Sequence, residues 1–145
     1  MIALRVYGTP APQGSKRHVG NGVMVESSAK VKPWRQDVKY AALEARGGYA
    51  VATIITGPVH VDLVFMLPRP RSHFRTGKNA HLLRDNAPTA PHRKPDLDKL
   101  IRSTLDALGE AGVWNDDAQV VGITATKTYT FDAPGAHISI TEAAA

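Results

Sequence analysis

The most regular pattern of apolar positions in the chain lies between residues 96 and 108. Its members are Leu97, Leu100, Ile101, Thr104, Leu105 and Leu108. At about 100° per residue these positions fall on one side of a helix, so the pattern predicts a helix packed on a core. Pro95 before the pattern and Gly109 and Gly112 after it are typical of helix entrances and exits. We therefore expect this helix to begin near Asp96 and to end near Leu108.

A weaker pattern of the same kind runs from Val31 to about Arg46. Apolar residues recur there at helical spacing, at Trp34, Val38, Ala41, Ala42 and Ala45. Gly47 and Gly48 follow directly and favour a helix end. We interpret Trp34 as an anchor in the core, with the stacking of a DNA base as the alternative.

Alternating apolar and polar residues predict four strands, over residues 2–7, 59–66, 121–129 and 137–141. The last two are separated by the turn sequence Asp132-Ala133-Pro134-Gly135, so we expect them to pair as a C-terminal hairpin. The element order is β-α-β-α-β-β. It predicts one α+β domain over residues 1–145, with the two main helices on one face of a mixed sheet.

Two long stretches, residues 8–30 and 69–93, are polar and show little periodicity. The first has side chains suited to phosphate contacts, at Gln13, Ser15, Lys16 and Arg17. The second has the cations Arg69, Arg71, Arg75, Lys78, Arg84 and Arg93, together with His73, His81 and His92. Connections of this length are typically functional or disordered. We interpret both as loops that contact DNA and become ordered on binding, with plain flexible loops as the alternative.

The net charge and its uneven distribution along the chain indicate what kind of partner the protein binds. The chain of 145 residues has a formal net charge of +5 and a pI of about 9.7, which favours a polyanionic partner. Residues 68–94 have seven Lys or Arg against one acid, whereas residues 95–145 have three against eight. This segregation is typical of a metal-dependent nuclease, in which one part contacts phosphates and another holds metal. Two solvated faces are the alternative.

Composition also limits the compartment and the chemistry. The sequence has 43% hydrophobic residues, no cysteine and no N-terminal apolar run long enough for a signal peptide or a membrane span. We therefore expect a globular cytoplasmic protein without disulfides or thiolate metal ligands. The histidines do not follow zinc-site spacings, so we interpret them as polar groups beside phosphate.

Four carboxylates stand at the borders of the second predicted helix. Asp96 and Asp98 stand at its start, and Asp116 and Asp117 follow its end after a short connection. If the next strand returns antiparallel to the helix, we expect the second pair to come back toward the first turn. Carboxylates about 4 Å apart repel by roughly 4 kcal/mol at an effective dielectric near 20, so a cation such as Mg²⁺ is expected between them. Helix capping and turn formation are the structural alternative for each pair.

Three pieces of sequence together resemble the RusA family of Holliday junction resolvases, which is common in phages and prophages. They are Lys94-Pro95-Asp96-Leu97-Asp98, Asp106-Ala107-Leu108 and Trp114-Asn115-Asp116-Asp117-Ala118-Gln119-Val120. The resemblance implies a small dimeric α+β endonuclease that nicks four-way DNA junctions with Mg²⁺ or Mn²⁺. By position, it implies catalytic roles for Asp96, Asp98 and Asp117. Lys99 stands where an Asn is usual, and Arg102 where the family often has a catalytic Lys.

We therefore predict a metal-dependent endodeoxyribonuclease that resolves four-way junctions by paired symmetric nicks during DNA recombination and repair. The expected ligands of Mg²⁺ or Mn²⁺ are Asp96, Asp98 and Asp117, with Asp116 as an alternative ligand or as a group that supports the ligands. Arg102 joins the catalytic group as a phosphate contact, because a guanidinium keeps its charge and cannot give up its proton. The predicted DNA-binding residues are Lys16, Arg17, Arg69, Arg71, Arg75, Lys78, Arg93, Lys94 and Lys99.

The symmetry of the expected substrate predicts a homodimer, because a C₂ dimer carries two equivalent sites for two symmetric nicks. The β-rich C-terminal segment and residues 47–58 are the candidate dimer faces. Three other functions remain open. They are a nuclease for flaps or other branched DNA, a non-catalytic DNA-binding module, and nucleotide-sugar transfer, for which the chain is short.

Overall fold

The computed structural model describes residues 1–14, 16–18, 24–26, 29–48 and 53–143, with the backbone alone for residues 16–18 and 24–26. Its main sheet has four strands in the order β1-β6-β4-β5. They are β1 (Ile2–Tyr7), β4 (Val59–Pro68), β5 (Val120–Thr130) and β6 (Gly135–Glu142). β6 is antiparallel to β1 and β4, whereas β4 and β5 are parallel, so the sheet is mixed as predicted.

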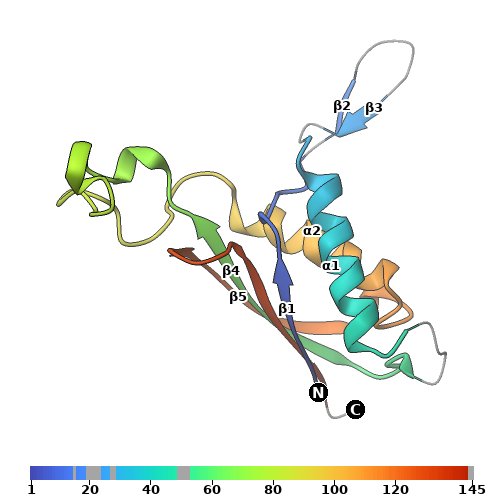
Figure 1. Cartoon of the computed structure of the whole chain (residues 1–145). Helices are drawn as coiled ribbons and strands as arrows, with labels where there is room; N and C mark the ends of the chain where they lie inside the picture. The colour runs from blue at the N-terminus through green and yellow to red at the C-terminus, as the bar shows by residue number, and fades with distance from the viewer. Residues whose placement is uncertain (15, 19–23, 27–28, 49–52, 144–145) are drawn as a thin grey trace.

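Two helices, α1 (Val31–Ala45) and α2 (Leu97–Glu110), lie on one face of this sheet (Figure 1). The core between helices and sheet includes Trp34, Val38, Leu63, Phe65, Leu100, Leu108, Ile138 and Ile140. Trp34 is 1% exposed, and its indole N–H donates to Thr104 Oγ1 at 3.1 Å, which ties α1 to α2. The α+β prediction and the interpretation of Trp34 as a core anchor are both confirmed.

The helix ends agree closely with the sequence pattern. α1 is followed by Gly47 and Gly48 with φ values of 83° and 91°, which L side chains rarely adopt. α2 has Asp96 as its N-cap and runs two residues beyond Leu108, so Gly109 lies inside its last turn. Gly112, with φ of 72°, then turns the chain toward β5.

The predicted pairing of the last two strands is wrong. β6 lies between β1 and β4, and β5 joins the outer side of β4. The chain between β4 and β5 contains α2, and a strand–helix–strand crossover suits parallel neighbours. β6 supplies Ala136, Ile138 and Ile140 to the buried face, as a central strand requires, whereas β5 is rich in threonine and partly exposed.

The first polar stretch contains a short hairpin that the sequence pattern did not predict. It consists of β2 (Lys16–His18) and β3 (Met24–Glu26), which are antiparallel and project beyond the start of α1 (Figure 1). Ser15 and residues 19–23 lie outside the described residues.

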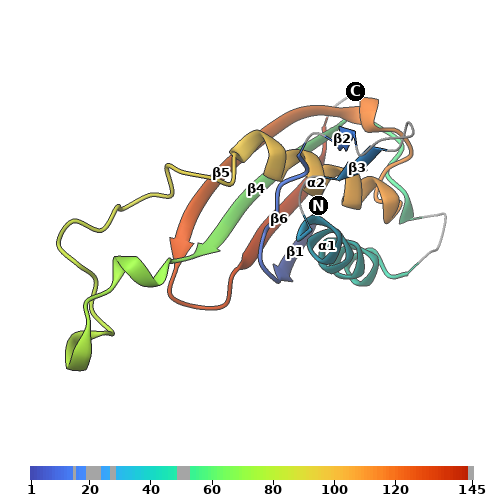
Figure 2. The ribbon, with the colours of Figure 1, turned by 90° about the horizontal axis from the view of Figure 1, so that it is seen from above.

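The second polar stretch, residues 69–93, forms an arm that projects from the end of β4 (Figure 2). We call it the basic arm. It contains two 3₁₀ turns and is closed on itself by backbone hydrogen bonds from Arg75 N to Leu82 O at 2.9 Å and from Arg84 N to His73 O at 2.8 Å. The arm therefore has a defined conformation of its own rather than the irregular path that the sequence indicated.

Candidate active site

The start of α2 carries the first pair of predicted site carboxylates. Asp96 is the N-cap residue, but its side chain makes no capping hydrogen bond. Its Oδ2 lies 3.6 Å from the Lys99 ammonium nitrogen instead. Asp98 is exposed in the first turn, where the helix dipole stabilises a negative charge. Side-chain capping therefore does not explain why Asp96 is an acid.

Cations surround this end of the helix. Arg93 and Lys94 are exposed just before α2, and Arg102 is exposed in its second turn. Lys127 of β5 donates to the carbonyl oxygens of Arg93 and Pro95, at 2.8 Å in each case. This contact fixes the segment that enters α2 against the sheet.

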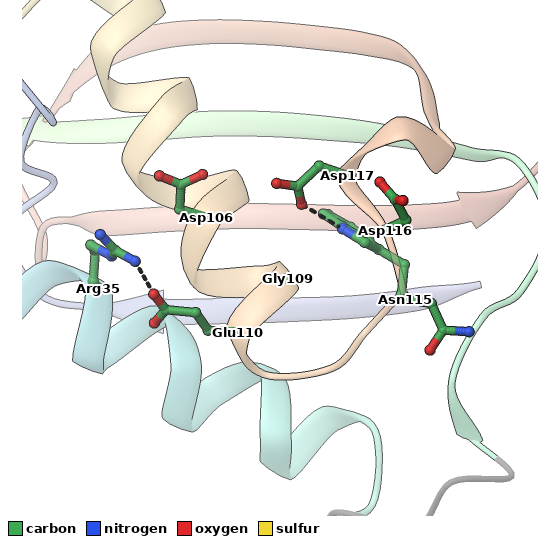
Figure 3. Close-up of a pocket in the computed structure, with 8 residues that line it drawn as sticks. Arg35, Asp106, Gly109, Glu110, Asn115, Asp116 and Asp117 are labelled. Atoms are coloured by element: carbon green, nitrogen blue, oxygen red, sulfur yellow. Dashed lines mark hydrogen bonds and ion pairs between the residues drawn. The ribbon is translucent and has the colours of Figure 1, made fainter.

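The second pair of carboxylates lies at the opposite end of α2, beside a pocket of about 530 Å³ (Figure 3). The pocket is lined by Arg35, Asp106, Gly109, Glu110, Trp114, Asn115, Asp116 and Asp117. The indole N–H of Trp114 donates to Asp117 Oδ1 at 3.1 Å, and a Cβ on Gly109 would come within 3.0 Å of the same oxygen. Because Trp114 is only 2% exposed, it is a fixed donor that sets the direction of this carboxylate.

Asp116, in the same turn, makes capping hydrogen bonds. Its Oδ1 accepts a hydrogen bond from the N–H of Ala118 at 2.8 Å, and the Asp116 N–H donates to Gln119 Oε1 at 2.8 Å. These bonds form a capping box at the start of the 3₁₀ turn η4 (Asp117–Gln119). The capping alternative therefore holds for Asp116.

Two acids of this pocket were not assigned a role from the sequence. Glu110 pairs with the Arg35 guanidinium of α1, and Asp106 is partly buried beside the pocket. The signal that could have identified them is a row of charged residues spaced by four along α2, Asp98, Arg102, Asp106 and Glu110. Residues at this spacing lie on neighbouring turns of one helix face, so the row connects the two acidic ends.

The expected meeting of four carboxylates in one region is wrong within a single chain. β5 does run antiparallel to α2, but this geometry places the end of the strand, not its start, beside the first helical turn. Lys127 marks the residue that reaches the first turn, while Asp117 precedes the strand and lies beside Gly109. The part of α2 from Asp98 to Gly109 spans about 16 Å at about 1.5 Å per residue.

One chain thus offers the donor chemistry of a Mg²⁺ site without a complete set of ligands. Carboxylate oxygens are the hard ligands that Mg²⁺ prefers. Within the described ranges, however, no three His, Cys, Asp or Glu residues are grouped closely enough to hold a metal ion. The four predicted ligands are instead divided between the two ends of α2.

The structure divides the cations of the basic arm into two groups. The guanidinium groups of Arg69, Arg75 and Arg84 donate to backbone carbonyl oxygens of the arm, at 2.8, 3.1 and 3.2 Å, and so hold its shape. Arg71 and Lys78 are exposed and have no partner among the described residues. Together with Arg93 at the end of the arm, which is also exposed and has no side-chain partner among the described residues, these two are the cations of the arm that are free to contact a phosphate.

The remaining predicted DNA-binding residues lie in two places. Lys16 and Arg17 are in β2, where only the backbone is described. Arg93, Lys94 and Lys99 stand around the start of α2. The basic arm ends at this same helix start, so its cations precede the first acidic pair directly along the chain.

The fold and the site together define a small α+β protein in which one helix has acids at both ends and a basic arm leads into it. The model of the RusA endodeoxyribonuclease family matches residues 7–141, and the chain belongs to this family. The chain is also 34% identical to the uncharacterized protein YqaN of Bacillus subtilis (strain 168), over 99% of this chain and 98% of that protein. The family resemblance seen in the sequence motifs is confirmed, and it indicates an endodeoxyribonuclease.

None of the helices in the described part of the chain is both long and apolar enough to cross a membrane.

Proposed function

We propose that this protein is a metal-dependent endodeoxyribonuclease that resolves four-way DNA junctions by paired symmetric nicks during recombination and repair. The observation that carries the proposal is the family match over residues 7–141, which includes all the carboxylates of the candidate site. The proposed cofactor is Mg²⁺, with Mn²⁺ as the alternative. The proposed location is the cytoplasm of a bacterial or phage-infected cell.

The proposed metal ligands are Asp96, Asp98 and Asp117. Asp116 is a further ligand through Oδ2, because its capping hydrogen bond uses only Oδ1. A bound metal ion would supply Lewis-acid polarisation of the scissile phosphate and a lowered pKa for the attacking water. Trp114 would contribute by holding the Asp117 carboxylate in one direction before DNA arrives.

Because these ligands lie at opposite ends of α2, we propose that a second chain completes the site. In a C₂ dimer that places the start of one α2 next to the end of the other, Asp96 and Asp98 meet Asp117 of the partner subunit. The same symmetry operation creates a second, equivalent site. Two equivalent sites are what two symmetric nicks in a four-way junction require.

Arg102 and Lys99 are the proposed phosphate contacts within each site. Arg102 follows Asp98 by one turn, and its planar guanidinium can donate to two oxygens of one phosphate. It keeps its proton, so it stabilises charge that develops on the phosphate rather than transferring a proton. Lys99 lies beside Asp96 and offsets the repulsion between the two neighbouring carboxylates.

A gel cleavage assay on four-way, flap and linear DNA of the same sequence, with Mg²⁺ or with EDTA, tests this function. We expect metal-dependent cleavage of the four-way junction at two opposed positions and little cleavage of linear DNA. Cleavage of flaps without cleavage of junctions would indicate a nuclease for other branched DNA. Junction binding without cleavage in Mg²⁺ or Mn²⁺ would indicate a non-catalytic binding module.

A further inference from the structure

Another pocket lies where the basic arm leaves β4 and returns to the start of α2. Its volume is about 240 Å³, and it shares no lining residue with the acidic pocket at the other end of α2. It is lined by Thr9, Pro10, Ala11, Pro12, Lys30, Leu67, Pro68, Pro70, Pro91, Lys94, Pro95 and Tyr129. These residues come from five segments that are far apart in the sequence, so the pocket exists only in the folded chain. We call it the proline pocket.

The lining of the proline pocket is mostly apolar and carries positive charge. Six of its twelve residues are prolines, out of ten in the whole chain, and a proline has no N–H to donate to a ligand. Its charged residues are Lys30 and Lys94, both exposed, and it contains no acid. The acidic pocket has the opposite balance, with four acids and one cation. The proline pocket therefore suits a ligand that combines an apolar body with negative charge.

Two hydroxyl groups are the other polar side-chain groups of this lining. Those of Thr9 and Tyr129 have no hydrogen-bond partner among the described residues. The Tyr129 ring itself is held in place, because the Arg69 guanidinium lies 4.5 Å from its centre and the His73 ring meets it edge-on at 5.2 Å. A fixed aromatic ring with a free hydroxyl can contact both the apolar surface of a nucleobase and its polar edge.

Hydrogen bonds from neighbouring elements fix the walls of the proline pocket. Ser103 of α2 is completely buried, and its Oγ donates to the carbonyl oxygen of Ala11 at 2.7 Å. On the opposite wall, the Lys127 ammonium donates to the carbonyl oxygen of Pro95 at 2.8 Å. Walls that are already fixed in the free protein lose little conformational freedom when a ligand binds. The pocket is therefore preorganised by α2 and β5.

We propose that the proline pocket binds one unstacked nucleobase of a branched DNA beside the phosphate that is cut, with Lys30 and Lys94 against the flanking phosphates. This inference rests on the proposed function, because it takes the phosphate at Asp96 as the one that reacts. Lys94 and Pro95 line the pocket and directly precede Asp96, and successive Cα atoms are about 3.8 Å apart. Successive nucleotides of one strand rise by about 3.4 Å, so a base within one or two nucleotides of that phosphate reaches the pocket.

The volume of the pocket and the cost of unstacking a base both favour a branch point. Pockets that bind drug-sized ligands have about 300–1,000 Å³, so a pocket of about 240 Å³ holds one ring system rather than a stacked pair. Removing a base from a duplex disrupts its stacking and pairing, and this cost is lowest for a base that is already unpaired. Stacking is interrupted at a branch point. The pocket therefore strengthens binding to branched DNA more than binding to linear DNA.

Junctions that lack a single base test the pocket without any cleavage. An abasic nucleotide is placed in turn at each position next to the branch point, and the affinity of the full chain is measured by fluorescence anisotropy in EDTA. We expect one position in the repeating arms at which the missing base weakens binding about 10-fold, the size expected from losing one stacked base. The same change in linear DNA of the same sequence should have no effect of this size.

Two pocket variants locate the effect. Thr9→Trp fills the pocket with an indole, so the abasic and the intact junction should bind equally well. Tyr129→Phe keeps the ring beside Arg69 and removes only the hydroxyl, so it should weaken binding of the intact junction several-fold and leave that of the abasic junction unchanged. The matched controls are Thr141→Trp on β6 and Tyr40→Phe on α1, both at exposed positions outside the pocket, which should behave as the wild type. Circular dichroism should show that all four variants are folded.

The outcomes separate the proline pocket from the proposed function. A wild type that binds every abasic junction as tightly as the intact one, or a Thr9→Trp variant that keeps the full abasic effect, would overturn the pocket. If that wild type still nicks junctions in Mg²⁺, the proposed function stands without the pocket. A protein that shows the abasic effect but cleaves no branched DNA in Mg²⁺ or Mn²⁺ would support base binding in the pocket and refute the function.

Discussion

The two ends of α2 carry the same type of side chain in contrasting surroundings. At the C-terminal end, Asp117 accepts a hydrogen bond from the buried Trp114 and lines a pocket. At the N-terminal end, Asp96 and Asp98 are exposed, and within the described part of the chain their one charged partner is Lys99, 3.6 Å from Asp96. One end is therefore preorganised by its own chain, whereas the other depends on what approaches it.

Because of this difference, one short helix has a preorganised carboxylate at one end and exposed carboxylates at the other. A carboxylate whose direction is fixed by a buried donor costs little to organise when a ligand binds. The carboxylates at the other end are surrounded by cations next to the basic arm, where we propose that a DNA phosphate arrives. Each end should therefore fail in its own way when it is altered.

The largest expected effect comes from neutralising one carboxylate at either end. Asp98→Asn and Asp117→Asn should each reduce junction cleavage at least about 100-fold, a typical loss when a key electrostatic group is removed from an active site. Junction binding should be unchanged or tighter, because the basic arm is intact. Gel-shift and cleavage assays on the same DNA measure the two quantities separately. Asp132→Asn, an exposed acid between β5 and β6, is the control and should cleave normally.

A smaller effect is expected from the donor that organises the C-terminal end. Trp114→Phe removes the N–H that holds Asp117 and should reduce cleavage by about 10-fold while raising the Mg²⁺ concentration needed for half activity. A purely structural role would lower the melting temperature and leave this metal dependence unchanged. Trp34→Phe is the matched control, because its indole bonds Thr104 in the core instead of a site carboxylate.

The basic arm offers a comparison within a single segment. Neutralising Arg71 and Lys78, two of the free cations of the arm, should reduce the slope of log affinity against log salt by roughly 0.9 for each phosphate that the arm then leaves uncontacted. Arg75→Gln should instead loosen the arm, because Arg75 donates to Leu83 and pairs with Asp85. A salt slope that is unchanged in the Arg71 and Lys78 double variant would show that the arm does not meet DNA.

The smallest predicted effect is on stability and lies away from both acidic ends. Burial raises the pKa of Asp37 on α1 above its ordinary value of 3.8. The folded state therefore holds this proton more tightly than the unfolded state, and this contribution to stability is lost as the pH rises through the folded pKa. Asp37→Asn should be more stabilising in urea denaturation at pH 7 than at a pH below 3.8. An equal effect at both pH values would contradict this prediction.

Both helices could be predicted from the sequence, because the residue patterns that indicate a helix and its ends are local. The spacing of Leu97, Leu100 and Leu108 determines one face of α2, and the glycines after each helix determine where it ends. Strand pairing could not be predicted in the same way. Apolar and polar residues alternate in both β5 and β6, and the neighbours of each strand depend on which of the two takes the central position in the sheet. β6 gains that position because its apolar residues are buried against both helices and strands.

The candidate site shows a second limit of sequence reasoning. The sequence analysis assumed that β5 runs antiparallel to α2, and the structure has this direction, but the position along the strand that meets the first helical turn was not predicted. Lys127 occupies that position, and nothing local to its sequence indicates its contact with the carbonyl oxygens of Arg93 and Pro95. The division of the arm cations into structural and free groups also depends on folding, because it is decided by which guanidinium reaches a carbonyl oxygen.

The most direct test of a site shared between two chains is to mix two inactive variants. In a dimer of one Asp98→Asn chain and one Asp117→Asn chain, one shared site contains both substitutions and the other contains neither. Mixing the purified variants, with time for subunit exchange, should therefore restore nicking of one strand of the four-way junction, although each variant alone is inactive. A mixture that remains as inactive as its components, while sedimentation shows that mixed dimers form, would contradict the shared site.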